Sequence, residues 1–182
     1  ATDVIVITKS PEGKKSSLNV FVVPIDATGL EVQTFGAHGL VGNSYGGLTM
    51  KDVFVPETAL IGDDGQGRTV FREHFLYWRL MQTAAAIGTA ERALEIMAER
   101  LKTRQAFGGP IGRFTHLQQP MGQHTTELKM AHSLAKEAAK LLDAGKLDEA
   151  EPLINGLKAE GVEIALNAVD AATRAFGGEG YS

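Results

Sequence analysis

The feature that most constrains this sequence is a single change of hydrophobic period near Arg68. Before this point, apolar residues form short β-branched or alternating runs, which are typical of strands. After it, apolar residues recur every three or four positions, which is typical of helices. The single switch predicts an α+β fold, in which an antiparallel β segment over residues 1–66 precedes an antiparallel bundle of long α-helices over residues 67–182.

Four runs in the first part predict strands, at residues 4–7, 18–23, 30–35 and 47–55. A turn-rich segment at residues 10–15 separates the first two runs. The link before the last run contains Gly36, Gly39, Gly42 and Gly46, so its backbone is expected to turn tightly or to approach another group closely. Short links between neighbouring runs predict one antiparallel sheet.

Three helices are expected in the second part. The first carries one apolar stripe for roughly nine turns, made up of Phe71, Phe75, Trp78, Ile87, Ala90, Leu94, Met97 and Leu101. Thr115-His116-Leu117-Gln118 predicts a capping box that opens a second helix, which runs to about Leu142. Residues 143–146 predict a helix stop, and the third helix runs from between Leu147 and Pro152 to Phe176. Short links make the three helices antiparallel neighbours.

Composition excludes several classes of protein and site. The net charge of −4 gives no electrostatic reason to expect nucleic acid or an anionic membrane as a partner. The absence of cysteine excludes a disulfide framework and fits a cytoplasmic location. No apolar run approaches the roughly 20 residues that span a bilayer, and the first residues predict a strand and not a signal peptide. A chain that begins within a strand is expected to be part of a longer protein.

Two stretches place an arginine and a phenylalanine just before glycines where a helix is expected to end. They lie at residues 104–109 and 174–178, and we call them the first and second glycine corners. A guanidinium and exposed backbone N–H groups at such corners suit a phosphate or pyrophosphate. The alternative for Arg104 is a solvated charge at a helix C-terminus, and the alternative for Gly177-Gly178 is a helix C-cap.

Other titratable residues predict no site. His116, His124 and His132 are spaced eight residues apart, about 12 Å along a helix, which is too far to share a metal ion. We therefore expect no metal. Glu91, Glu95 and Glu99 alternate with Arg92 and Arg100, which predicts a solvated helix face.

Four segments, in order along the chain, resemble the acyl-CoA dehydrogenase superfamily of flavoproteins. Val53-Phe54-Val55-Pro56 and the glycine-rich residues 61–67 resemble the signature that closes that family's middle β domain. Residues 104–111 are similar to its "R--FG-PI" motif, and residues 176–181 are similar to its "FGG-GY" motif. The resemblance implies that residues 1–66 are part of the middle β domain and that residues 67–182 are a truncated C-terminal helical bundle.

The resemblance implies FAD as cofactor, bound at an interface between subunits, with the glycine corners contacting the FAD that is usually the partner subunit's. Position by position, this assigns FAD contacts to Arg104, Ala106, Phe107, Phe114, Thr115, Arg174, Phe176, Gly177 and Gly178. Two of these depart from the family pattern, because Arg174 and Thr115 stand where glutamine is usual. A third departure lies in residues 39–45, where the family's "GLRGS-T" arginine is replaced and Tyr45 is added.

The resemblance also implies the chemistry. The family removes the α-proton of an acyl thioester with a carboxylate, while the β-hydride passes to flavin N5. That base usually follows the "FGG-GY" motif, so it is expected after Ser182, and no catalytic residue is expected within this chain. A minority of members place the base where this sequence has Trp78, which has no titratable proton.

Arg79 matches an arginine that shapes the family's substrate pocket, and its alternative is a helix-face charge. Leu76 replaces an acidic residue that often precedes this arginine by three positions. For Trp78, packing in the core is favoured over a role in the pocket, because it falls on the same stripe as Phe71 and Phe75.

The implied activity is FAD-dependent α,β-dehydrogenation of an acyl-CoA or of an acyl group on a carrier protein, in fatty acid metabolism. The expected partners are electron-transfer flavoprotein or another acceptor, and further copies of the chain in a dimer or a homotetramer. Two alternatives stay open. One is a different flavin oxidation on the same fold. The other is a non-catalytic subunit whose glycine corners contact the FAD of an active partner.

Overall fold

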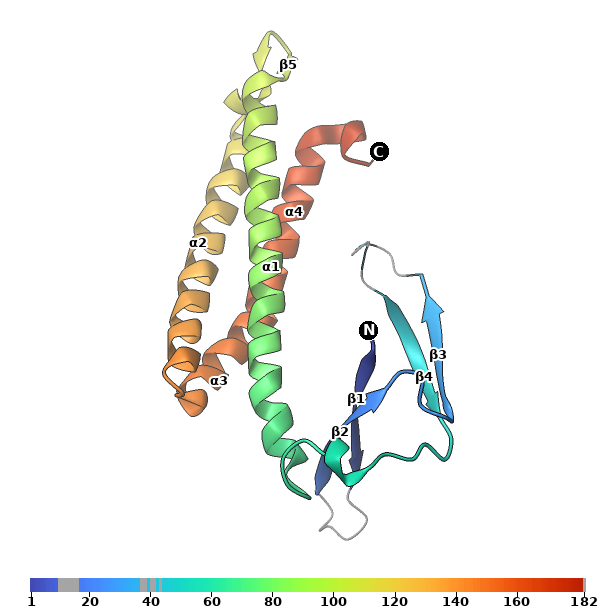
Figure 1. The fold of residues 1–182 in the computed structure, drawn as a ribbon. Helices are drawn as coiled ribbons and strands as arrows, with labels where there is room; N and C mark the ends of the chain where they lie inside the picture. The colour runs from blue at the N-terminus through green and yellow to red at the C-terminus, as the bar shows by residue number, and fades with distance from the viewer. Residues whose placement is uncertain (10–16, 37–38, 40–41, 43, 182) are drawn as a thin grey trace. The chain divides into compact units, whose positions relative to one another are not determined.

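The computed structural model of this chain describes residues 1–9, 17–36, 39, 42 and 44–181. These residues form two compact units, Ala1–Glu73 and His74–Ser182, which we describe separately (Figure 1). The predicted turn at residues 10–15 lies outside the described residues, and so does His38. The same holds for three positions of the 39–45 loop that differs from the family motif, Leu40, Val41 and Asn43.

The first unit contains two antiparallel strand pairs. Strand β1 (Asp3–Lys9) pairs with β2 (Leu18–Pro24), and β3 (Leu30–Phe35) pairs with β4 (Tyr45–Met50). The four strands and their antiparallel direction are confirmed. The prediction of one sheet is wrong for the described residues, in which the two pairs are separate two-stranded sheets.

Strand β4 is shorter than the run of residues that predicted it. It ends at Met50, and Asp52 has a left-handed φ of 51°, which ends the extended backbone before Val53. The expected close approach in the glycine-rich link occurs at Gly46, where a Cβ would overlap the carbonyl group of Gln33 on the neighbouring strand.

The glycine-rich segment after the 3₁₀ turn η1 (Glu57–Ala59) lies against β2. The buried side chain of Asn19 donates to Asp64 Oδ1 at 2.7 Å and accepts the backbone N–H of Gly65 at 2.7 Å. A Cβ on Gly67 would lie 2.6 Å from the Leu18 carbonyl oxygen, so only glycine allows this approach. Asn19 and this glycine therefore fix the backbone that leads into the first long helix.

The helical part has the expected order. Helix α1 (Gly67–Thr103) is followed by a hairpin of β5 (Gln105–Ala106) and β6 (Gly109–Pro110), a 3₁₀ turn η2 (Ile111–Arg113) and helix α2 (Thr115–Asp143). The chain then forms α3 (Leu147–Gly156), the π-helical segment η3 (Leu157–Gly161), α4 (Val162–Phe176) and the 3₁₀ turn η4 (Gly177–Tyr181). Figure 1 shows α2 running back along α1, and α3 and α4 returning beside them, which confirms the antiparallel bundle.

Two details of these helices differ from the sequence-based predictions. The capping box at Thr115 is wrong, because Phe114 is the N-cap and no side chain caps the helix; Gln118 instead donates to the Gly112 carbonyl oxygen at 2.8 Å. The third predicted helix is interrupted by η3, where a Cβ on Gly161 would lie 3.2 Å from Thr83 of α1. The helix stop is confirmed at Gly145, which has a φ of 70°.

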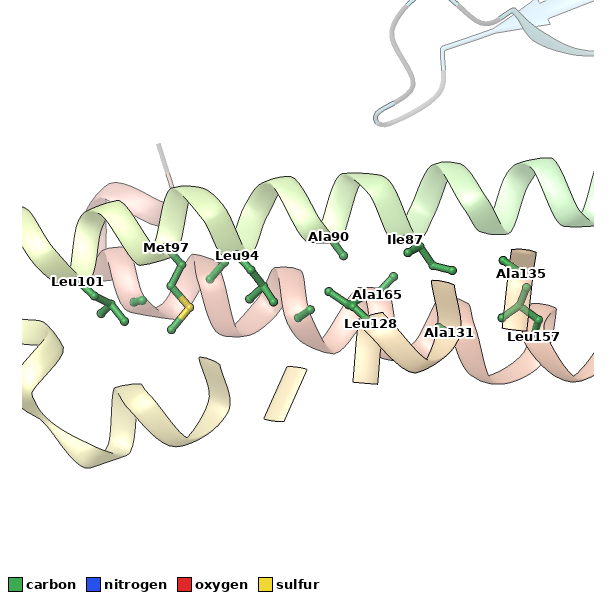
Figure 2. Packing of buried hydrophobic residues seen from close by; sticks show 13 residues of the cluster. Ile87, Ala90, Leu94, Met97, Leu101, Leu128, Ala131, Ala135, Leu157 and Ala165 are labelled. Atoms are coloured by element: carbon green, nitrogen blue, oxygen red, sulfur yellow. The ribbon is translucent and has the colours of Figure 1, made fainter. Parts of the chain in front are cut away.

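The core of the second unit lies along the facing sides of these helices. Figure 2 shows Ile87, Ala90, Leu94, Met97 and Leu101 of α1 pointing toward small residues and leucines of α2, η3 and α4. A second cluster, at the other end of the bundle, contains Leu76, Ala138, Leu142, Ala150 and Ile154. Each fully buried leucine or isoleucine contributes about 1.5–3 kcal/mol. Among the described residues, no helix combines the length and the apolar character needed to cross a membrane.

Candidate functional site

The first glycine corner is a two-residue hairpin. Phe107 and Gly108 form its loop with φ values of 53° and 87°, and Gln105 and Ala106 pair with Pro110 and Gly109. Two consecutive left-handed residues match the turns that suit tight hairpins. A phenylalanine in this conformation is unusual, and its side chain is 88% exposed. The hairpin therefore presents an aromatic ring outside the bundle.

Arg113 supports this hairpin. Its guanidinium donates to the carbonyl oxygens of Phe107 and, at 3.4 Å, of Gly108. It also lies 5.1 Å from the centroid of the Phe114 ring, which in turn meets the Phe107 ring edge-on at 6.1 Å. Arg113 was not among the predicted site residues, because a sequence does not show that a side chain reaches back six positions to a turn.

The second glycine corner ends α4. Gly177 has a φ of 61° and its N–H donates to the Arg174 carbonyl oxygen. A Cβ on Gly180 would overlap the Thr173 carbonyl oxygen, so this glycine lets η4 fold back on the helix. Arg174 forms an ion pair with Asp170 at 2.8 Å, and its side chain is 74% exposed.

The two corners, far apart in the sequence, border one cavity of about 1030 Å³, which we call the corner pocket. It is lined by Arg100, Arg104, Phe107, Ile111, Phe114, His116, Leu117, Arg174, Ala175, Phe176, Gly177, Gly178 and Glu179. Seven of the nine predicted FAD-contacting residues lie here. The other two do not line it: Ala106 lies in β5, and Thr115 is the exposed first residue of α2.

Arg100 is a charged residue of this pocket that was not among the predicted site residues. It was expected on a solvated face, but its side chain is only 18% exposed and forms a 3.0 Å ion pair with Glu179. Its guanidinium also lies 5.0 Å from the centroid of the Phe176 ring. A signal was present in the sequence, because positions four apart share a helix face, and Arg100 precedes Arg104 by four. The expected solvated face is confirmed for Arg92, Glu95 and Glu99, and Glu91 is partly exposed.

Glu179 carries the charge that balances these arginines. A hydrogen bond from Arg100, the charge of Arg100 and, more weakly, the charge of Arg104 lower the pKa of the Glu179 carboxyl. Its carboxylate is 61% exposed. The corner pocket is therefore lined by three arginines, three phenylalanines and one acidic group. Arginines suit a phosphate, and the phenylalanine rings suit an aromatic body attached to it.

A second cavity, of about 570 Å³, surrounds Arg79 and is called the Arg79 pocket. It is lined by Phe75, Trp78, Arg79, Gln82, Asn155, Lys158 and Ala159. Arg79 donates to Asn155 Oδ1 at 2.5 Å, and its guanidinium lies 4.3 Å from the Phe75 ring centroid. The prediction that Trp78 packs in the core is wrong: it is 45% exposed, and Leu76, at 1%, is the buried residue of this turn. The buried face of α1 differs here from the predicted apolar stripe, because Leu76, and not Phe75 or Trp78, faces α2 and α3.

Two of the histidines lie beside carboxylates. His124 Nδ1 lies 2.9 Å from Glu127, and His132 Nδ1 lies 3.1 Å from Glu91. The part of the chain that the structure describes contains no group of three potential metal-ligating side chains.

Known proteins are similar to this chain in sequence and fold. The family described as "Acyl-CoA dehydrogenase, C-terminal domain" matches residues 65–182. A probable acyl-CoA dehydrogenase of Mycobacterium tuberculosis, FadE2, is 30% identical over 90% of this chain and 41% of its own length. The structure of a glutaryl-coenzyme A dehydrogenase with glutaryl-CoA is 26% identical, with a TM-score of 0.90 over all of this chain and 46% of that one.

A third similarity concerns the fold alone. PigA, in a structure with FAD and proline, is 24% identical and has a TM-score of 0.92 over all of this chain and 48% of that one. The chain spans less than half the length of each of these three proteins. The family match covers the whole helical part and both glycine corners. The chain therefore belongs to the acyl-CoA dehydrogenase family, of which it carries the C-terminal domain.

Proposed function

We propose that this chain is part of an FAD-dependent acyl-CoA dehydrogenase and that its corner pocket binds the FAD. The observation that carries the proposal is the convergence of the two glycine corners on one cavity with three arginines. The pocket fits such a cofactor, because arginine guanidinium groups suit a pyrophosphate and aromatic rings suit the flat ring systems at either end of FAD.

In this proposal Arg104 and Arg174 bind the FAD pyrophosphate, together with the backbone of Gly177 and Gly178. Phe107 and Phe176 offer apolar contacts, and Arg113 keeps the hairpin that presents Phe107 in place. When bound, FAD supplies an acceptor for the hydride removed from the substrate. The glycine-rich turns allow a close approach of the ligand to the backbone, which side chains at these positions would hinder. The assignments of Ala106 and Thr115 remain predictions that rest on the family resemblance alone.

The Arg79 pocket is the proposed substrate side of this chain. Asn155 and the Phe75 ring fix the guanidinium of Arg79, and the Thr83 hydroxyl donates to the Arg79 carbonyl oxygen at 2.9 Å. Thr83 is 1% exposed and packs against Gly161, so the turn of α1 that bears Arg79 is fixed by the π-helical segment. The proposed substrate is an acyl thioester of coenzyme A or of a carrier protein, and the α-proton is removed by a carboxylate outside this chain.

The direct test is anaerobic titration of the purified full-length protein with a panel of acyl-CoA thioesters, followed through the flavin absorption band. We expect the oxidised flavin band to bleach with at least one thioester. Bound flavin that no thioester bleaches would favour the non-catalytic subunit. Bleaching only by an amine or a nitroalkane would favour a different oxidation, an alternative supported by the similar fold of PigA, whose structure contains FAD and proline.

The remaining parts of the proposal concern partners and location. We propose a dimer or tetramer built through the bundle, supported by exposed apolar side chains on its helices, among them Ile96, Met130, Leu134 and Leu166. Sedimentation of the full-length protein at tens of micromolar tests this, and a monomer alone would contradict it. The proposed electron acceptor is electron-transfer flavoprotein or a similar carrier. The cytoplasmic location remains a prediction, to be checked by cell fractionation.

A further inference from the structure

Arg100 and Glu179 form an ion pair inside the corner pocket, and neither belongs to the residues that the family resemblance assigns to FAD. We propose that Arg100 is a third anion-binding arginine of this pocket and that Glu179 is its resident counterion, which the phosphate group of an incoming ligand displaces. The inference rests on the proposed function in one respect only, namely that the ligand is FAD. The group that Arg100 would bind is a pyrophosphate, which FAD contains and which also exists as a free ion.

The position of Arg100 favours binding over simple solvation. It lies four positions before Arg104, which directly follows α1 and whose N–H donates to the Arg100 carbonyl oxygen at 2.9 Å, and both arginines line the corner pocket. The Phe176 ring, 5.0 Å from its guanidinium, helps to keep the side chain 18% exposed. Its Nε is buried and has no hydrogen-bond partner among the described residues. A guanidinium has five N–H donors, so Arg100 retains donors beyond those that Glu179 uses.

The geometry of the pair shows that an anion fits beside Arg100. Nη1 lies 3.0 Å from Glu179 Oε2, and Nη2 lies 3.0 Å from Oε1, so the carboxylate is bound by both arms of the guanidinium. Phosphate oxygens are recognised by arginine in the same two-pronged way. The hydrogen bond and charge of Arg100 lower the pKa of the Glu179 carboxyl, and the charge of Arg104 adds a smaller lowering. The Glu179 carboxylate therefore interacts with two arginines, and the proposed pyrophosphate needs the same two arginines.

The difference in exposure between the two side chains makes it feasible for a phosphate group to replace the Glu179 carboxylate. Glu179 is 61% exposed, whereas Arg100 is mostly covered, so the carboxylate can move into water while the arginine stays in place. Because the carboxylate half of the pair is solvent-exposed, water screens the attraction and the pair contributes only modestly to stability. The competing explanation is a clamp, in which the pair serves only to attach η4 to α1. The two explanations predict opposite effects of removing the Glu179 charge, because a displaced competitor opposes ligand binding and a clamp supports it.

The experiment is calorimetric titration of flavin-free full-length protein with FAD and, separately, with inorganic pyrophosphate. We expect Glu179→Gln to tighten the binding of both ligands by about 2- to 5-fold. Arg100→Met should weaken both by about 10-fold or more, and Arg100→Lys should recover part of the loss. In the Arg100→Met background, Glu179→Gln should give a smaller gain than in the unmodified background, because most of the competition acts through Arg100.

The matched control is Glu99→Gln, which removes the exposed partner of Lys102 next to Arg100 on the same helix. It should leave both affinities unchanged. Weaker binding in Glu179→Gln, with a lower melting temperature, would establish the clamp and overturn the proposal. Unchanged affinity in Arg100→Met would overturn it as well.

The pyrophosphate titration separates this inference from the proposed function. If pyrophosphate binds with the expected variant effects and FAD does not bind, the assignment of FAD fails and the role of Arg100 and Glu179 stands. If the unmodified protein binds neither ligand, the inference itself is overturned.

Discussion

Arg104 is the residue on which the proposed cofactor site depends most directly. Its backbone is fixed from both sides, because its N–H donates to the Arg100 carbonyl oxygen at 2.9 Å and its carbonyl oxygen accepts the N–H of Ile111 at 3.0 Å. Its side chain is exposed at the mouth of the corner pocket. The residue thus combines a fixed position with a guanidinium that a ligand can reach.

Replacing Arg104 by alanine in the full-length protein should weaken FAD binding by roughly 10- to 150-fold, because a charge-assisted contact of this type contributes about 1.5–3 kcal/mol. The melting temperature of the flavin-free protein should change little, since a cation at a helix end contributes only about 0.3–1 kcal/mol. Calorimetric titration and a thermal melt measure the two effects. Lys102→Ala, at the same helix end, is the control, and equal losses of affinity in both variants would refute the assignment.

Glu127 gives a second prediction at this scale, one of pH dependence. A hydrogen bond from Gln123, and then one with His124, lower the pKa of Glu127 from its usual 4.5. A lowered carboxyl pKa stabilises the folded state above the unfolded pKa, and this stabilisation is lost as the pH falls through the folded pKa. Unmodified protein should therefore be more stable than Glu127→Gln at neutral pH, and the difference should shrink below pH 4.5. Urea unfolding at several pH values tests this; a constant difference would contradict it.

At the scale of single elements, two glycines in helical surroundings should respond in opposite ways to the same substitution. Gly88 lies in the exposed middle of α1, and Gly145 ends the turn after α2 with a φ of 70°. Within the part of the chain that the structure describes, a Cβ on either would meet no atom within 4 Å. Gly88→Ala should stabilise the protein by about 0.5–1 kcal/mol, through helix propensity. Gly145→Ala should destabilise it by about 1 kcal/mol or more, because an L-residue is strained there.

Urea unfolding of both variants, beside the unmodified protein, measures these changes. Since neither position has a steric neighbour, each result isolates a backbone preference. Destabilisation by Gly88→Ala would show that α1 is strained or in contact at this point in the complete protein.

The same scale shows what the sequence could predict. Helices and strands with long periodic patterns were predictable, because local spacing determines which face is buried. Predictions failed where tertiary contacts decide: Leu76 replaced Trp78 in the core because α2 and α3 face it, and Phe114 replaced Thr115 as N-cap. At the candidate site, the motif residues were found from the resemblance. Arg100, Arg113 and Glu179 were missed, because their partners lie across a turn or 79 positions away.

At the scale of the molecule, the chain spans less than half the length of its relatives, and the corner pocket is an open cavity of about 1030 Å³. The resemblance implies that other domains enclose much of the flavin. The 182-residue chain by itself should therefore bind FAD far more weakly than the full-length protein. Calorimetric titration of both compares the two affinities. Stoichiometric yellow flavin on the purified 182-residue chain would contradict this expectation.

Trp78, half-exposed against Phe75 in the Arg79 pocket, has one further consequence. It is the only tryptophan among the 182 residues, so the tryptophan fluorescence of this chain comes from a single known place. The indole lines the same pocket as the Arg79 guanidinium and the amides of Gln82 and Asn155. The wavelength of its fluorescence emission depends on the polarity and hydration of that surface. The chain thus contains a native fluorescent reporter in the Arg79 pocket, its proposed substrate side. This reporter needs no added dye and is separate from the two glycine corners.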